Sequence, residues 1–421
     1  MKSNRYIVLL DNQHESTIRS VEKEFAVSVT SSELLSKDNR SFDIIDDSHA
    51  VLYKNLSMMV VDNVDEKQLS LSLTDKKSPI VYFEKERDFY VADELSLIEE
   101  LKMDIDALKN KILELESTIR KKPAQQPSVS ATELEWGLKA IGMGDTLFSG
   151  KGVNICILDT GFEIQHPDFA GREIEGKSFI EGEDWDRDPN GHGTHCGGIA
   201  CGNVRNDTGK RYGIAKDSNL KIGKVLSDKG KGSTSSIVDA IDWAITKQFR
   251  IISLSLAAPA KLNEKPSVLF ETIGKKALDN NSLLIAAAGN DSNRPASLAP
   301  VSVPANSLSI MAVAAIDKEM QIARFSNAGI NAATGGNIDI CAPGVNILSA
   351  YPQKNGSSDN YESLSGTSMA TPFVSGMAAL YMEQFPNLTA REIWGLLENN
   401  AKPIEKLKYR DIGKGLIQVI K

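Results

Sequence analysis

The 421-residue chain has few cysteines and no excess of basic residues. Its four cysteines, Cys156, Cys196, Cys201 and Cys341, stand among apolar or small residues and lack the spacing of metal ligands. We therefore expect reduced, buried thiols, as in a cytoplasmic protein. The formal net charge is −8, and no basic stretch offsets it, which argues against a nucleic-acid partner.

The chain also lacks long hydrophobic runs. No segment is long and apolar enough to span a membrane, so we expect no membrane partner. The apolar run near the N-terminus, Tyr6–Leu10, is too short for the core of a secretory signal. These absences favour a cytoplasmic location.

Four zones follow one another along the chain. Residues 1–93 hold short runs rich in Val, Ile and Tyr alternating with helix-like stretches, which predicts a small α+β domain. Residues 94–122 form a heptad helix, 123–131 a polar linker with two prolines, and 132–421 a larger domain. In the first zone we expect strands at Arg5–Leu10, Ala50–Leu56, Met58–Val61 and Pro79–Phe83, and helices at His14–Phe25 and Asp65–Leu73.

The second zone carries an unbroken heptad repeat. Every first position is Ile and every fourth is Leu, the choice that favours a parallel two-stranded coiled coil. Asp104 would face Lys109 of a second copy, and Lys111 would face Glu116. The alternative is an amphipathic helix lying on its own protein. The predicted pairing residues are Ile98, Leu101, Ile105, Leu108, Ile112, Leu115 and Ile119.

The last zone alternates apolar strands with helices. Thr132 and Glu135 have the spacing of a capping box that opens a helix. Strands that are apolar on both faces, with helices between them, predict an α/β fold with a mostly parallel sheet and helices on both faces. Expected strands are Val153–Leu158, Lys221–Val225, Ile251–Leu256, Leu283–Ala288 and Ser309–Ala314, and expected helices are His192–Cys201, Ser235–Lys247, Leu269–Asn280 and Ser368–Phe385.

Three segments of this zone offer the groups of a hydroxyl nucleophile and its base. Asp159 ends an apolar strand and is followed by Thr-Gly, which places a carboxylate at a strand's carboxyl end. His192 stands in Gly-His-Gly-Thr-His, among small residues that leave its ring accessible. Ser365 and Ser368 both precede a helical run, and Ser368 is better placed because backbone N–H groups at a helix start stabilise an oxyanion.

His195 lies three residues after His192, a spacing that raises the question of zinc. The pattern lacks the Glu of a metalloprotease helix, and no third ligand is evident. We therefore expect His195 to be a packed, hydrogen-bonded residue and not a catalyst.

Asp-Thr-Gly, His-Gly-Thr-His and Gly-Thr-Ser-Met-Ala-Thr-Pro occur here in the order of the three motif blocks of the subtilase family, which residues from about 133 to 421 resemble. The resemblance implies a subtilisin-like serine endopeptidase with Asp159 as orienting acid, His192 as base and Ser368 as nucleophile. No cofactor is implied for the chemistry. Asn290, in Ala-Ala-Gly-Asn, is implied as the side-chain donor to the oxyanion.

The same resemblance implies two extended edges, Gly230–Gly232 and Ser253–Ala258, that pair with the backbone of a protein or peptide substrate. Two family glycines are replaced by Ala257 and Ala258, and Ser302 stands near a pocket floor that is often glycine. We expect a narrowed pocket and a preference for small or medium residues before the cleaved bond. The implied substrate-binding residues are Gly230, Gly232, Ser255, Leu256, Ala257, Ala288, Gly289 and Ser302.

An acidic loop ahead of His192 raises the question of structural calcium. Asp184, Asp186 and Asp188 fail the EF-hand spacing, so a solvated loop, a calcium site and attraction of basic substrates stay open. The family often binds calcium through an Asp soon after the catalytic one, which Asp168 matches. Loop 203–212 is rich in basic residues, which argues against a calcium site at Asp168.

The N-terminal zone resembles, in position and element order, the propeptide inhibitor domain of many subtilases. We therefore expect a regulated intracellular zymogen, with the heptad helix pairing two copies or binding a partner. Two other interpretations are a dedicated maturase of one peptide or protein, and an inert protease fold that acts as a coiled-coil scaffold.

Overall fold

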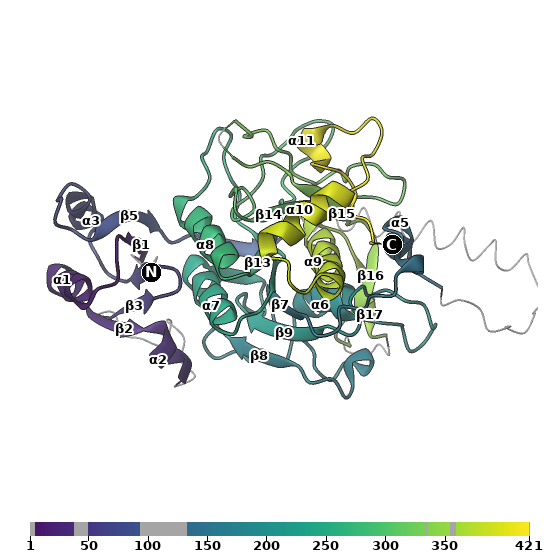
Figure 1. The fold of residues 1–421 in the computed structure, drawn as a ribbon, viewed down its shortest axis with the longest axis horizontal. Helices are drawn as coiled ribbons and strands as arrows, with labels where there is room; N and C mark the ends of the chain where they lie inside the picture. The colour runs from purple at the N-terminus through teal and green to yellow at the C-terminus, as the bar shows by residue number, and fades with distance from the viewer. Residues whose placement is uncertain (1–4, 38–48, 93–132, 334, 354–358, 421) are drawn as a thin grey trace, which may run out of the picture.

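The computed structural model describes residues 5–37, 49–92, 133–333, 335–353 and 359–420. It contains an N-terminal unit, residues 5–92, and a large unit, residues 133–420, which lie side by side (Figure 1). The heptad positions 98–119 and the linker 123–131 lie outside the described residues.

The N-terminal unit is a five-stranded sheet in the order β2-β3-β4-β1-β5. Strand β1 is buried along its whole length and pairs antiparallel with β4 and β5. This confirms the small α+β fold. The elements are β1 Tyr6–Leu10, α1 Glu15–Phe25, β2 Ser28–Ser31, α2 Ser32–Lys37, β3 His49–Tyr53, β4 Met58–Val61, α3 Glu66–Ser72 and β5 Ile80–Lys85.

The large unit is built on a seven-stranded sheet in the order β15-β14-β13-β11-β7-β9-β8, with every neighbouring pair parallel. Its central strands are apolar on both faces because helices cover both sides. The strands are β7 Asn154–Asp159, β8 Glu175–Ser178, β9 Asn219–Lys224, β11 Ile251–Leu254, β13 Leu283–Ala287, β14 Met311–Ile316 and β15 Ile340–Pro343.

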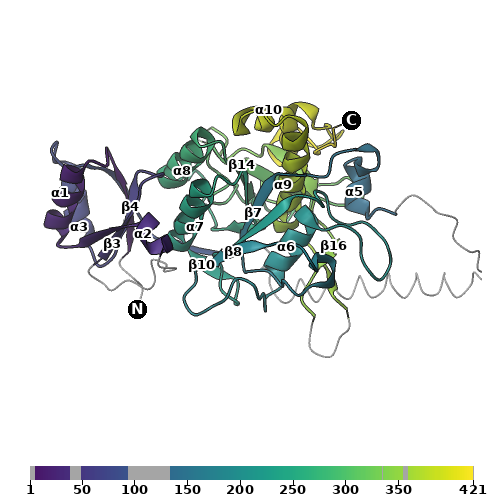
Figure 2. The same cartoon turned by 60° about the horizontal axis from the view of Figure 1, so that its bottom comes forward.

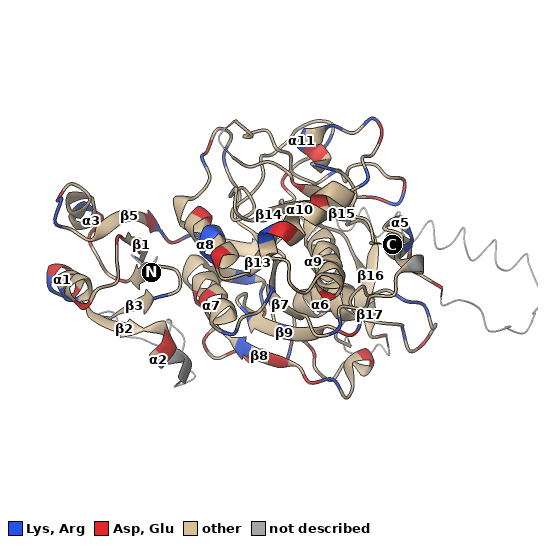
Figure 3. Ribbon diagram, in the orientation of Figure 1, with Lys and Arg blue, Asp and Glu red and all other residues tan. Residues whose placement is uncertain are grey.

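Two helices, α6 and α9, pack on each other and on the central strands. Helix α9 is tan over nearly all of its length in Figure 3, as expected for a helix inside the core. Helices α7 and α8 lie on the side of the N-terminal unit, as Figure 2 shows. The helices are α5 Trp136–Ala140, α6 His192–Cys201, α7 Thr234–Thr246, α8 Val268–Asp279, α9 Thr367–Gln384, α10 Ala390–Asn400 and α11 Tyr409–Ile412, and a two-stranded sheet joins β16 Ile347–Ala350 to β17 Tyr361–Leu364.

A third sheet connects the two units. Strand β6, Asp88–Val91, follows the N-terminal sheet in the chain and lies between β10, Lys231–Ser233, and β12, Leu256–Ala257. Both pairings are antiparallel. The end of the N-terminal unit therefore forms the middle strand of a sheet whose outer strands belong to the large unit.

The structure confirms the predicted mixed fold, and helix α6 and strand β4 have the predicted bounds. The predicted capping box is wrong, because helix α5 begins at Trp136 and its N-cap Glu135 makes no side-chain cap. All four cysteines are free and buried, as expected. Among the described residues, no helix combines the length and apolar character needed to cross a membrane.

Candidate active site

Three elements bring the predicted triad together. Asp159 is the last residue of β7, His192 the first of α6, and Ser368 the second of α9. The carboxyl edge of a parallel sheet is the usual place for an active site, because side chains from several strand and helix ends converge there. All three side chains are buried in this state.

Asp159 and His192 form an oriented acid–base pair. The Nδ1 atom of His192 lies 2.7 Å from Oδ1 of Asp159. The backbone N–H of Thr160 donates to the same oxygen at 2.7 Å, which fixes the carboxylate. A histidine whose Nδ1–H is held by a carboxylate presents its Nε2 as the base.

The hydroxyl of Ser368 is hydrogen-bonded to the neighbouring substrate edge at Ser255. Its Oγ donates to the carbonyl oxygen of Ser255 at 3.0 Å, and Oγ of Ser255 donates to the carbonyl of Ser368 at 2.8 Å. These two reciprocal hydrogen bonds fix the start of helix α9 beside the substrate edge that contains Ser255. The other serine considered from the sequence, Ser365, accepts a bond from the backbone N–H of Asn346 and lies outside this arrangement.

Asn290 has the geometry of an oxyanion donor. Its Oδ1 accepts from both the backbone N–H and the hydroxyl of Thr367, each at 2.9 Å. Because a backbone N–H can only donate, this contact identifies the oxygen and leaves Nδ2 on the other side of the amide. Nδ2 is buried and has no hydrogen-bond partner among the described residues, so it is available to a developing oxyanion.

The two predicted substrate edges are paired with the chain's own residues. Gly232 is opposite Phe89, and Leu256 is opposite Val91. The backbone N–H of Val91 donates to the carbonyl of Gly230 at 3.1 Å. Residues 88–91 thus occupy the cleft as an extended substrate would.

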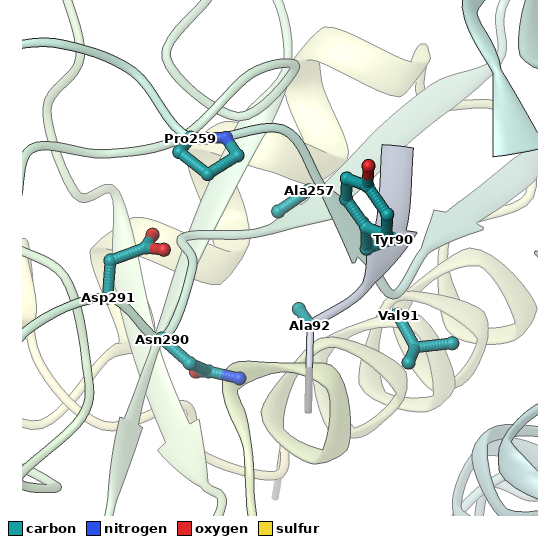
Figure 4. A pocket seen from close by; sticks show the side chains of 7 residues that line it. All are labelled: Tyr90, Val91, Ala92, Ala257, Pro259, Asn290 and Asp291. Atoms are coloured by element: carbon teal, nitrogen blue, oxygen red, sulfur yellow. The ribbon is translucent and has the colours of Figure 1, made fainter. Parts of the chain in front are cut away.

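Ala92 follows Val91 in the chain and lies beside Asn290, the oxyanion donor. It packs with Ala257 and Ala287 in one apolar cluster. Figure 4 shows Ala92 between Ala257 and Asn290, while Val91 points away from them. The cavity at this position measures ≈ 200 Å³ and is lined by Tyr90, Val91, Ala92, Ala257, Pro259, Asn290 and Asp291.

Ser302 is not among the lining residues of this pocket, but it lies directly behind one of them, Asp291. The side chain of Ser302 is fully buried, and its Oγ donates to Oδ2 of Asp291 at 3.2 Å. Nδ2 of Asn327 donates to both of these groups. A Cβ on Gly289 would lie 2.4 Å from Oγ of Ser302, so the hydroxymethyl group lies directly against that glycine. Ala288, also predicted to bind substrate, is buried, and its carbonyl accepts from the backbone N–H of Ser302.

Two of the four metal candidates, Asp168 and Asp188, accept hydrogen bonds from protein groups. Asp168 accepts hydrogen bonds from the hydroxyls of Tyr212 and Tyr361, and the Arg205 guanidinium lies 4.3 Å from the centre of the Tyr361 ring. Asp188 is buried and accepts four hydrogen bonds from neighbouring residues. Asp184 is exposed and Asp186 half-buried. The acidic loop also forms an ion pair with a buried lysine, because Glu183 lies 3.0 Å from Nζ of Lys224.

Among the described residues, the one cluster with metal-ligand spacing is Asp159, His192 and Cys196. Burial raises the pKa of the Cys196 thiol to about 11, so its sulfur is a neutral thiol near neutral pH. Burial likewise lowers the pKa of His195 to about 3, and its Nε2 contacts the carbonyl of Ile347 at 2.9 Å. His195 is thus the packed residue that we expected. The cluster of Asp159, His192 and Cys196 consists of the acid–base pair with a neutral thiol beside it.

Sequence reasoning missed two features of the site. Thr367, which orients Asn290, could have been noticed because it directly precedes the nucleophile. Residues 88–92 carry no motif, and their position becomes visible only through the β6 pairings.

An oriented Asp–His pair, a serine at a helix start and an amide aimed at the reacting position define a serine endopeptidase of the subtilisin kind. A model of the subtilase family matches residues 150–415, which is more than half of the chain. The chain belongs to the subtilase family.

Individual relatives agree with this assignment. Subtilisin DY of Bacillus licheniformis is 36% identical over 272 residues, which cover 65% of this chain and 91% of that protein. Subtilisin Savinase of Lederbergia lenta is 36% identical over 290 residues, covering 68% and 97%. The M-protease of Shouchella clausii (strain KSM-K16) is 34% identical over 338 residues, covering 79% and 82%.

Proposed function

We propose that this serine endopeptidase is made as a zymogen whose N-terminal unit fills the substrate cleft and is cut from the protease between Ala92 and Asp93. The observation that carries the proposal is β6, which pairs with both substrate edges and leads Ala92 to Asn290. The sequence had placed the boundary after residue 93. We propose the boundary one residue earlier, after Ala92.

The chemistry follows from the positions of the side chains. His192 removes the proton from Oγ of Ser368 as this oxygen attacks the carbonyl carbon of Ala92. Nδ2 of Asn290 and the backbone N–H of Ser368 stabilise the resulting oxyanion. The imidazolium then protonates the amine of Asp93, which leaves, and water hydrolyses the acyl-enzyme in a second round.

Side-chain fit supports this register. Ala92 is small and packs against Ala257 and Ala287 beside the pocket. Three residues earlier, Phe89 is fully buried, and its ring lies edge-on to Phe270 with centroids 5.6 Å apart. We propose the same preference for other substrates: a small residue before the bond and a bulky apolar one three positions earlier.

Carboxylates of the N-terminal unit dock on two helix starts of the large unit. Glu86 accepts from the backbone N–H of Ser235, in the first turn of α7, at 3.1 Å. Glu84 accepts from Ser267, the N-cap of α8, at 2.9 Å. Negative charge at a helix N-terminus is stabilising, so these contacts favour a docked inhibitor.

The cut has a consequence for the heptad segment. Because residues 98–119 follow Asp93 in the chain, they would stay with the mature protease and not with the inhibitor. We propose that they pair two protease copies or bind a partner. The heptads in the sequence are the sole support for this pairing, and the cytoplasmic location stays a prediction.

A fluorophosphonate probe tests the proposed activity. We expect the full-length chain to be labelled at Ser368, slowly while the N-terminal unit is docked and faster once it has been removed. Ser368→Ala should abolish labelling. A scaffold with an inert protease fold would remain unlabelled in both forms, whereas a dedicated maturase would be labelled but would cut few peptides of a library.

A further inference from the structure

Asp188 links the two segments that carry the acid and the base. It is 1% exposed, and its carboxylate accepts bonds from Oγ1 of Thr160 at 2.8 Å and from the backbone N–H of Gly191 at 3.0 Å. It also accepts from the backbone N–H and the hydroxyl of Thr194, at 2.8 and 2.7 Å. All four partners are neutral donors, the arrangement that suits an ionised carboxylate.

These donors flank the catalytic residues directly. Thr160 follows Asp159, while Gly191 and Thr194 stand on either side of His192. The hydroxyl of Thr160 in turn accepts from the backbone N–H of Gly193 at 2.9 Å. One side chain thus fixes the end of β7 against the start of α6, although it belongs to neither element.

The position of His192 at a helix start gives this carboxylate an electrostatic role as well. The N-cap of α6 is Gly191, which makes no side-chain cap. Asp188 accepts from the N-cap N–H and from that of the third helical residue, so it caps the helix from outside. A helix N-terminus disfavours positive charge, and a buried carboxylate there offsets this effect on an imidazolium.

Several titratable groups of the described residues lie near the His192 ring. Asp159 on β7 is its direct partner, and Cys196 and His195 on α6 are neutral near neutral pH. Lys224 on β9 donates to the carbonyl of Thr160, and its charge is countered by Glu183 and Asp228. The residue before Asp188, Arg187, is exposed.

We propose that Asp188 is a positioning residue of catalysis, which holds His192 against Asp159 and supplies the second negative charge that stabilises the imidazolium in the transition state. The proposal explains why an acidic residue of this loop is buried among four neutral donors. It rests on the endopeptidase activity of the chain.

The test compares Asp188→Asn with Asp184→Asn, which removes the same charge from an exposed position of the same loop. Rates are measured with a peptide substrate across the pH range, on the full-length chain after processing. For Asp188→Asn we expect kcat to fall about 10- to 100-fold, less than the roughly 10⁴-fold loss when the orienting carboxylate of a triad is itself neutralised. The acid limb of kcat/KM should move to lower pH by about half a unit, because a lost negative charge disfavours the protonated base.

Asp184→Asn should have the kcat and the pH profile of the wild type. If the wild type itself is inactive, the proposed endopeptidase activity fails, and not the role of Asp188 alone. A second measurement needs no turnover. In the Ser368→Ala protein, the His192 ring resonances should titrate at lower pH when Asp188→Asn is added.

A loss of kcat with unmoved pH limb and histidine titration would make Asp188 a structural residue and overturn the proposal. Asp188→Glu keeps the negative charge, so the acid limb of kcat/KM should stay at the wild-type pH although kcat falls. If neither variant yields a folded protein, the carboxylate is needed for folding and the proposed role is rejected.

Discussion

Replacing Phe89 by Ala should release the inhibitor from the processed protease. Phe89 is fully buried in an apolar core that both units share, and it lies edge-on to Phe270 of the large unit. Truncating a buried Phe to Ala costs about 3–5 kcal/mol. Since this ring is buried by the large unit, we assign about 3 kcal/mol to docking, which weakens association roughly a hundredfold.

The assay follows activity on dilution. Wild-type and Phe89→Ala proteins are processed to completion, verified by mass, and diluted into a fluorogenic peptide. Activity per molecule rises as the inhibitor dissociates, so the concentration at half-maximal activity should be roughly a hundredfold higher for Phe89→Ala. Val81→Ala, at a side chain of the same unit that is 55% exposed, is the control and should leave this concentration unchanged. A midpoint within about threefold of the wild type would refute the assigned role of Phe89.

Two further predictions concern the pocket and the interface. Ala92→Phe should slow self-cleavage at least about tenfold, because the side chain of Ala257 narrows the pocket beside residue 92, and Ser302→Gly should restore part of the rate in a gel time course. Burial raises the pKa of the Asp242 carboxyl, which accepts from Ser32 and Asn55 of the N-terminal unit. Its stabilising contribution is therefore complete below about pH 4 and is lost as pH rises through the raised pKa. In the Ser368→Ala protein, the Tm advantage over Asp242→Asn should shrink from pH 4 to pH 7, and an advantage that grows would contradict this.

The sequence predicted the triad and the large sheet because both depend on local patterns. Strand β7 and helix α6 are continuous apolar or small-residue runs that end or begin at the catalytic residue. The occupant of the cleft could not be predicted in this way. Strand β6 has four residues, and its partners lie more than a hundred residues away in the chain.

The acidic loop shows a second limit of sequence reasoning. The spacing of Asp184, Asp186 and Asp188 is compatible with a cation site or a solvated loop. Which carboxylate turns inward depends on donors from Thr160 and Thr194, which the chain brings near only on folding. Local pattern therefore identified the loop but not the function of its buried member.

Mass spectrometry of the purified full-length chain tests the central claim most directly. If Ser368 attacks the bond after Ala92, the protein should convert to two fragments whose masses place the new N-terminus at Asp93. The Ser368→Ala protein should stay intact under the same conditions. An intact wild type, a cut at another bond, or the same cut in Ser368→Ala would contradict the account.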